Sequence, residues 1–133
     1  MALVLAVLTV GMLAMAGLVI DGGAALAARG RAADVAQQAA RAGADALVPG
    51  SLRASGPAGL RIDRAAARAA ADRVLVAGEV TGQVSVDGDT VTVRAQVRRP
   101  TALLSAVGVN EVSGAASATA MVLYGGTDQE GLG

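Results

Sequence analysis

The sequence predicts an α+β protein in which one long N-terminal helix is followed by a second helix and a small antiparallel sheet. Residues 2–20 contain no charged side chain, and small residues at helical spacing continue without a break to residue 47. After residue 80 the apolar period changes from helical to two, on both sides of an Asp-Gly pair. The expected parts are a transmembrane helix over 1–20, a helical stalk over 21–48, a small α+β head over 49–124 and a disordered tail over 125–133.

The first part has the length of a membrane span. Twenty helical residues rise about 30 Å, which matches the hydrocarbon thickness of a bilayer. Thr9 is the only polar residue in the stretch, and its hydroxyl can bond to a preceding backbone carbonyl. A cleaved signal peptide is the alternative, because Ala25-Leu26-Ala27 has the small-x-small form of a cleavage site. The length of the apolar run, the absence of a basic residue before it and the position of Asp21 favour the membrane helix.

Asp21 is the first charged residue after the apolar stretch. A charged group inside a membrane would suggest a functional site, whereas one at the end of an apolar run marks the interface with water. The interfacial interpretation is favoured, and the helix is then expected to continue out of the membrane as a stalk. If it runs unbroken from residue 2 to 47, it is about 70 Å long.

A seam of small residues follows Asp21 at alternating steps of three and four: Ala25, Ala28, Ala32, Val35, Ala39, Ala42 and Ala46. Gly17 adds a small residue within the membrane segment, where small side chains let helices pack closely. Alanine is so abundant here that other registers also collect alanines. The positions predicted to pack against other helices are Gly17, Asp21, Ala32, Ala39 and Ala46.

Beyond the stalk, residues 50–60 read as a loop and residues 61–76 as a second helix that stops at Gly78. Residues 80–86 and 90–97 alternate around Asp87-Gly88, which predicts a hairpin with a valine-rich buried face, and Pro100 closes the second strand. Residues 101–108 form a short apolar helix or turn that Thr101 can cap, and residues 111–123 form the last strand.

The composition argues against an enzyme. The chain has no histidine, cysteine or lysine, so the common general base, thiol nucleophiles and the usual zinc ligands are absent. Asp87-Gly88-Asp89 lacks the further acidic ligands of a calcium loop and is expected to be only a turn. Net charge is zero and aromatic residues are nearly absent, so no nucleic-acid partner is expected. No catalytic, cofactor-binding or metal-binding residue and no small-molecule substrate is predicted.

The helix with "GLVIDGGAALAARGRAADVAQQAARAGADAL", followed by "VTVRAQV", "ALLSAVG" and "VSGAASATAMV", resembles the TadE/TadG-like Flp pilus-assembly proteins of bacteria. The resemblance implies a pilin-like fold and a membrane-anchored minor pilin or pseudopilin whose long helix packs with other pilin-like subunits. Its partners would be membrane lipid, other subunits of the Tad system and, optionally, further copies of itself. Members of the family usually carry a glycine-glutamate processing signal before the apolar run, which this chain lacks.

The resemblance also implies a single-pass protein of the cytoplasmic membrane with its C-terminal head outside the cytoplasm. The positive-inside rule favours the opposite orientation, because Arg29, Arg31 and Arg41 all follow the apolar run. We follow the resemblance. The sequence therefore predicts a non-catalytic, membrane-anchored component of Flp pilus assembly; a membrane-tethered binding module and a small secreted domain are the alternatives.

Overall fold

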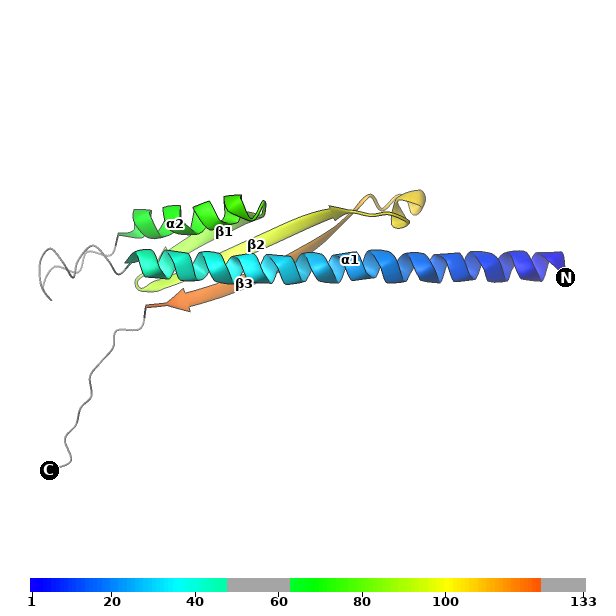
Figure 1. Cartoon of the computed structure of the whole chain (residues 1–133), viewed down its shortest axis with the longest axis horizontal. Helices are drawn as coiled ribbons and strands as arrows, with labels where there is room; N and C mark the ends of the chain where they lie inside the picture. Colours follow the sequence, from blue (N-terminus) through cyan, green and yellow to red (C-terminus); the bar gives the residue numbers. More distant parts are fainter. Residues whose placement is uncertain (48–62, 123–133) are drawn as a thin grey trace, which may run out of the picture.

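The computed structural model describes residues 1–47 and 63–122, and these confirm the predicted α+β architecture (Figure 1). The elements in chain order are α1 (Ala2–Leu47), α2 (Arg64–Ala77), β1 (Thr81–Asp87), β2 (Thr90–Pro100), the short 3₁₀ helix η2 (Leu104–Val107) and β3 (Glu111–Met121). The predicted loop over 50–60 and the tail over 125–133 lie outside the described residues, as does the last part of the predicted third strand.

Helix α1 is continuous over 46 residues, as the unbroken helical pattern predicts. Thr9 is accommodated in the apolar segment as expected, because its hydroxyl donates to the carbonyl oxygen of Leu5 at 2.8 Å. Gly22 and Gly23 both lie within the helix, so the pair does not interrupt it.

Helix α2 begins three residues later than predicted because Asp63 caps it. The Asp63 carboxylate accepts hydrogen bonds from the N–H groups of Ala65 and Ala66, two of the donors that a helix start leaves free. Gly78 ends the helix as expected. The inward face consists of Ala67, Ala71 and Leu75, spaced four residues apart, whereas Val76 is 77% exposed.

The three strands form one antiparallel sheet with β2 in the centre, in the order β1-β2-β3. The β1–β2 hairpin turns at Gly88-Asp89, and Gly88 has a φ of 58°, a conformation that glycine adopts without strain. Strand β2 continues three residues beyond the predicted Val97, through Arg98 and Arg99, because β3 pairs with it as far as Glu111 opposite Pro100.

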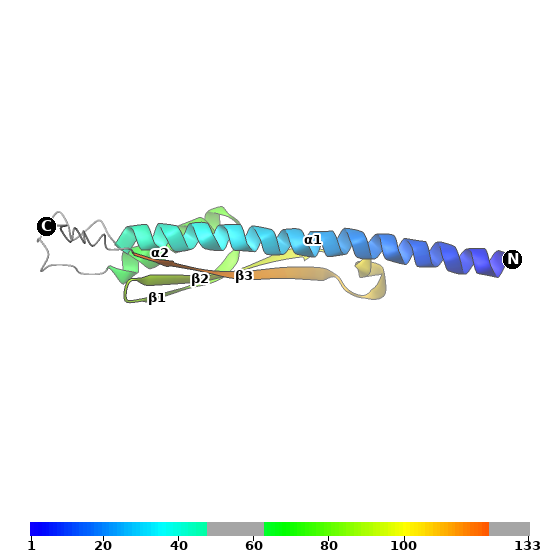
Figure 2. The ribbon, with the colours of Figure 1, turned by 90° about the horizontal axis from the view of Figure 1, so that it is seen from below.

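The two helices cover one face of this sheet (Figures 1 and 2). The core lies between the helices and the sheet, and Val91, Val93, Ala95 and Val97 of β2 point into it, as predicted. Val84 and Val86, also predicted as buried, are only half-buried because β1 is an edge strand. Residues 28–47 of the predicted stalk provide the largest helical surface of this core.

Candidate functional site

Asp21 is the most unusual buried group in the described part of the chain, since it is a carboxylate only 2% exposed. Its two oxygens accept three backbone hydrogen bonds from the segment that follows β2. Oδ1 accepts from Ala102 N–H at 3.0 Å, and Oδ2 accepts from Leu103 N–H at 3.1 Å and Leu104 N–H at 2.7 Å. Asp21 thus fastens α1 to a segment that lies more than 80 residues away in the sequence.

The three N–H groups stand at the start of η2, where a helix leaves its first donors unpaired. Thr101, predicted to cap this turn, instead donates its hydroxyl to the carbonyl oxygen of Val109. Asp21 therefore supplies the cap from another element. The sequence indicated an acidic residue at the end of the apolar run, but nothing local in it pointed to this partner.

The electrostatics of the contact favour the charged carboxylate. The hydrogen bond from the N–H of Ala102, together with those from Leu104 and Leu103, lowers the pKa of Asp21, and burial opposes this effect only in part. Asp21 is consequently an anion at neutral pH, held by backbone dipoles that point at it.

Gly17 lies one helical turn before Asp21 on the same face of α1 and is also buried. A Cβ atom added at Gly17 would stand 3.2 Å from the Cβ of Leu103, which is tighter than ordinary carbon contacts. The absence of a side chain at Gly17 therefore allows the β2–β3 connection to approach α1 closely enough for the Asp21 hydrogen bonds.

The remaining predicted packing positions lie farther along α1. Ala32 and Ala39 are completely buried in the core of this chain, and Ala46 is half-buried. The buried face agrees with the predicted seam at Ala28, Ala32 and Ala39 and then departs from it. The full set of buried residues on α1 is Gly17, Asp21, Ala28, Ala32, Ala36, Ala39, Ala40, Gly43, Ala44 and Leu47. The structure thus places four of the five predicted positions in contacts within the chain, and their contact with other subunits stays a prediction.

Two glycines that the sequence analysis did not single out control the closeness of this packing. A Cβ atom at Gly114 of β3 would overlap the α1 backbone, standing 2.6 Å from the Cα of Arg29. A Cβ atom at Gly43 would stand 2.9 Å from a methyl carbon of Val91. A glycine inside a strand often marks such a close backbone approach. The role of Gly114 could therefore have been predicted from its position in the third strand.

The apolar segment of α1 lies beyond the sheet and is exposed. The larger side chains between Leu3 and Ile20 are 55–78% exposed, and Gly17 is the first buried residue of the helix. Among the described residues α1 is the one helix long and apolar enough to cross a membrane. Exposed apolar surfaces of this size mark sites of contact with a membrane or with another protein.

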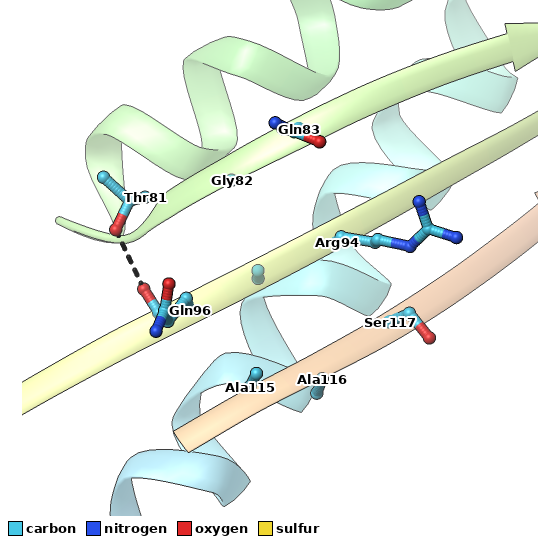
Figure 3. A pocket seen from close by; sticks show the side chains of 9 residues that line it. Thr81, Gly82, Gln83, Arg94, Gln96, Ala115, Ala116 and Ser117 are labelled. Carbon is cyan, nitrogen blue, oxygen red and sulfur yellow. Dashed lines mark hydrogen bonds between the residues drawn. The ribbon is translucent and has the colours of Figure 1, made fainter. Parts of the chain in front are cut away.

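The face of the sheet that points away from the helices carries polar side chains and a shallow hollow (Figure 3). Gln83, Arg94, Gln96 and Ser117 stand around this hollow, and Thr81 donates its hydroxyl to the backbone oxygen of Gln96 at 3.1 Å. No acidic side chain lines it. Within residues 1–47 and 63–122, no group of three or more histidine, cysteine, aspartate or glutamate side chains is placed to hold a metal ion.

Comparison with known proteins identifies a family-model match. No curated protein and no solved structure matches the chain. The match is to the Tad family model, described as "Putative Flp pilus-assembly TadE/G-like", and it covers the apolar segment and most of the buried face of α1. Residues 1–46 of the chain therefore carry the TadE/G-like Flp pilus-assembly signature, which confirms the resemblance noted in the sequence and supports involvement in Flp pilus assembly.

Proposed function

We propose that the chain is a non-catalytic, single-pass membrane protein of Flp pilus assembly, with its head outside the cytoplasm. The observation that carries this proposal is the continuity of α1. One helix presents an uncharged, exposed apolar surface over residues 2–20 and then becomes the central packing element of the head. The family match covers these same two parts of the helix.

The proposal assigns the apolar half of α1 to contact with lipid and with the helices of other pilin-like subunits. In a membrane, close helix packing depends on small residues. Apart from the adjoining helix backbone, no described residue lies within 4 Å of where a Cβ of Gly11 would stand. Gly17, Asp21, Ala32 and Ala39 support such assembly by fixing the head to α1, because these residues are already buried within the chain. Ala46, which is half-buried, remains partly accessible to a partner.

A labelling experiment tests the anchoring and the orientation together. The chain has no cysteine, so Ser117→Cys on the open face of the sheet creates a unique thiol. We expect a membrane-impermeant maleimide to label this variant in intact cells of a Flp-piliated bacterium, and we expect the labelled chain to sediment with membranes. The unsubstituted chain is the matched control for background labelling.

Two results would contradict the proposal. Labelling only after the cytoplasmic membrane is permeabilised would place the head inside the cell, as the arginines after the apolar run suggest. Labelled chain in the culture medium would indicate release after signal cleavage. Involvement in assembly itself is tested by deleting the gene and counting pili, and normal piliation would refute it.

A further inference from the structure

The connection between β2 and β3 is an exposed apolar loop, here called the tip (residues 101–109). It contains no charged side chain. Val107 is 75% exposed, and Leu103 and Val109 are 46% and 44% exposed. Exposed aliphatic side chains grouped on one projecting loop are uncommon on a surface that faces water, and they suggest contact with an apolar partner.

The position of the tip identifies that partner. The tip lies beside the last turn of the apolar segment, where Leu103 contacts α1 at Gly17 and the backbone of residues 102–104 is bonded to Asp21 (Figures 1 and 2). At this level of α1 the side chains of Leu18, Val19 and Ile20 are all more than half exposed. The tip therefore extends the apolar surface of the proposed membrane helix sideways at the end nearer the head.

The charges next to the tip are arranged as at a membrane surface. Arg98 and Arg99 are exposed at the end of β2, immediately before the tip. Strand residues rise about 3.3 Å each, so the Cα atoms of these two arginines stand within about 10 Å of Thr101, the first residue of the tip, on the side of the head. Arginine side chains at this depth reach the phosphates of lipid headgroups while the apolar residues beyond them lie deeper.

The backbone of the tip is also suited to a medium poor in water. Backbone groups without partners are costly away from water, so a loop that enters a membrane must satisfy them internally. The Asp21 carboxylate accepts the three N–H groups at the start of η2. The backbone N–H groups of Gly108 and Val109 donate to the carbonyl oxygens of Ser105 and Leu104, respectively. The backbone N–H of Thr101 donates to the carbonyl oxygen of Asn110.

We propose that the tip inserts into the boundary between headgroups and acyl chains of the bilayer that α1 crosses. The chain then contacts the membrane at two places, and the Asp21 contact holds these two places at the same depth. This inference rests on the proposed membrane crossing of α1, and its test separates the two.

Tryptophan fluorescence provides the test, because the chain contains no tryptophan of its own. Val107→Trp reports on the tip, and Leu8→Trp reports on the apolar segment. Val76→Trp on α2 is the matched control, since Val76 and Val107 are the same residue type with nearly equal exposure, 77% and 75%. Each full-length variant is reconstituted in phosphatidylcholine–phosphatidylglycerol vesicles with plain or brominated acyl chains, and its far-UV circular dichroism is compared with that of the parent.

We expect brominated lipid to quench Val107→Trp and Leu8→Trp and to leave Val76→Trp unchanged. Acrylamide in the water should quench Val76→Trp far more than Val107→Trp. If Val107→Trp perturbs the fold, Ala106→Trp provides a second exposed position on the tip with the same expected result.

Three results would overturn the inference, and they differ in whether the proposed membrane crossing of α1 survives. If only Leu8→Trp is quenched by brominated lipid, α1 crosses the membrane but the tip lies in water. If neither is quenched, the proposed membrane crossing fails together with the tip insertion. If Val107→Trp is protected from acrylamide without being quenched by brominated lipid, and the protection increases with protein density in the vesicles, a second copy of the chain covers the tip instead of lipid.

Discussion

Substitution of Gly114 by alanine tests how closely β3 is pressed against α1. The residues of β3 that face the alanine-rich surface of the helix include Gly114, Ala116, Ala118 and Ala120. A new Cβ at Gly114 would lie 2.6 Å from the Cα of Arg29. Carbon atoms pack best at about 3.5–4.0 Å, so β3 would have to move outward by about 1 Å.

The expected cost follows from that displacement. Overpacking a core costs about 1–3 kcal/mol, and a value near the upper end applies because the opposing atoms are backbone that cannot rotate away. Alanine regains about 0.5–1 kcal/mol relative to glycine inside a strand. The net loss is about 2 kcal/mol in the free energy of unfolding, which corresponds to a fall of roughly 10 °C in the melting temperature of a head of this size.

The measurement is thermal unfolding of the full chain in detergent micelles, followed by far-UV circular dichroism, with hydrogen exchange of the β3 amides as a local readout. Gly30→Ala is the matched control, because Gly30 is exposed on α1 and, apart from the adjoining helix backbone, no residue of 1–47 or 63–122 lies within 4 Å of its missing Cβ. This control should be stabilised by about 0.5–1 kcal/mol, as for any glycine in an exposed helical position. If Gly114→Ala melts at or above the temperature of Gly30→Ala, β3 does not rest on the α1 backbone and the reasoning is refuted.

Further predictions concern Asp21 and the buried face of α1. Because the pKa of Asp21 is lowered in the folded chain, its contact stabilises the fold fully above the ordinary carboxyl value of about 3.9 and is lost as the pH falls through the lower, folded value. Asp21→Asn should remove this part of the acid-induced loss of stability in a series of melting curves against pH, and an unchanged acid limb would show that the contact does not form. Ala39→Leu should destabilise the head by about 1–3 kcal/mol because Ala39 is completely buried, whereas Ala46→Leu at a half-buried position should cost much less. Equal denaturation midpoints for these two variants would contradict the observed orientation of α1.

The helices and the hairpin were predictable because their signals are local. A continuous helical pattern predicted α1, and the Asp-Gly pair between alternating strands predicted the turn at Gly88. The start of α2 was also present in the sequence, since Asp63 is a favoured capping residue, but the alanine-rich pattern around it extends in both directions.

The orientation of α1 was only partly predictable. Counting the seam at 3.5 residues per turn placed Ala42 and Ala46 inward, whereas the buried residues recur eleven residues apart, as in Gly17, Ala28 and Ala39. That repeat corresponds to about 3.67 residues per turn, which is close to the value of about 3.6 in an ordinary α-helix. Positions chosen by a strict seven-residue repeat drift around an ordinary α-helix by about 20° per heptad. Because alanines occupy the neighbouring positions as well, only the sheet that α1 contacts selects the buried ones.

The contact between Asp21 and the start of η2 depends on the assembled fold. A buried carboxylate needs donors, but the sequence does not state which backbone N–H groups will supply them when they lie more than 80 residues away. The role of Gly17 also depends on the assembled fold, because its missing side chain matters only where Leu103 approaches α1. Gly17 was identified as a small residue within the apolar segment and Asp21 as the charged residue at its end, but the contacts of both required the structure.

The straight course of α1 from the apolar segment into the core has a mechanical consequence. Because α1 lies along the sheet without a linker, a force that pulls the helix along its axis loads the contacts with β2 and β3 in shear (Figures 1 and 2). Many close contacts between small residues then resist together, and the Asp21 hydrogen bonds are loaded with them. A component built this way transmits a displacement of the apolar segment of α1 to its head, so the tilt of that segment sets the direction of the head.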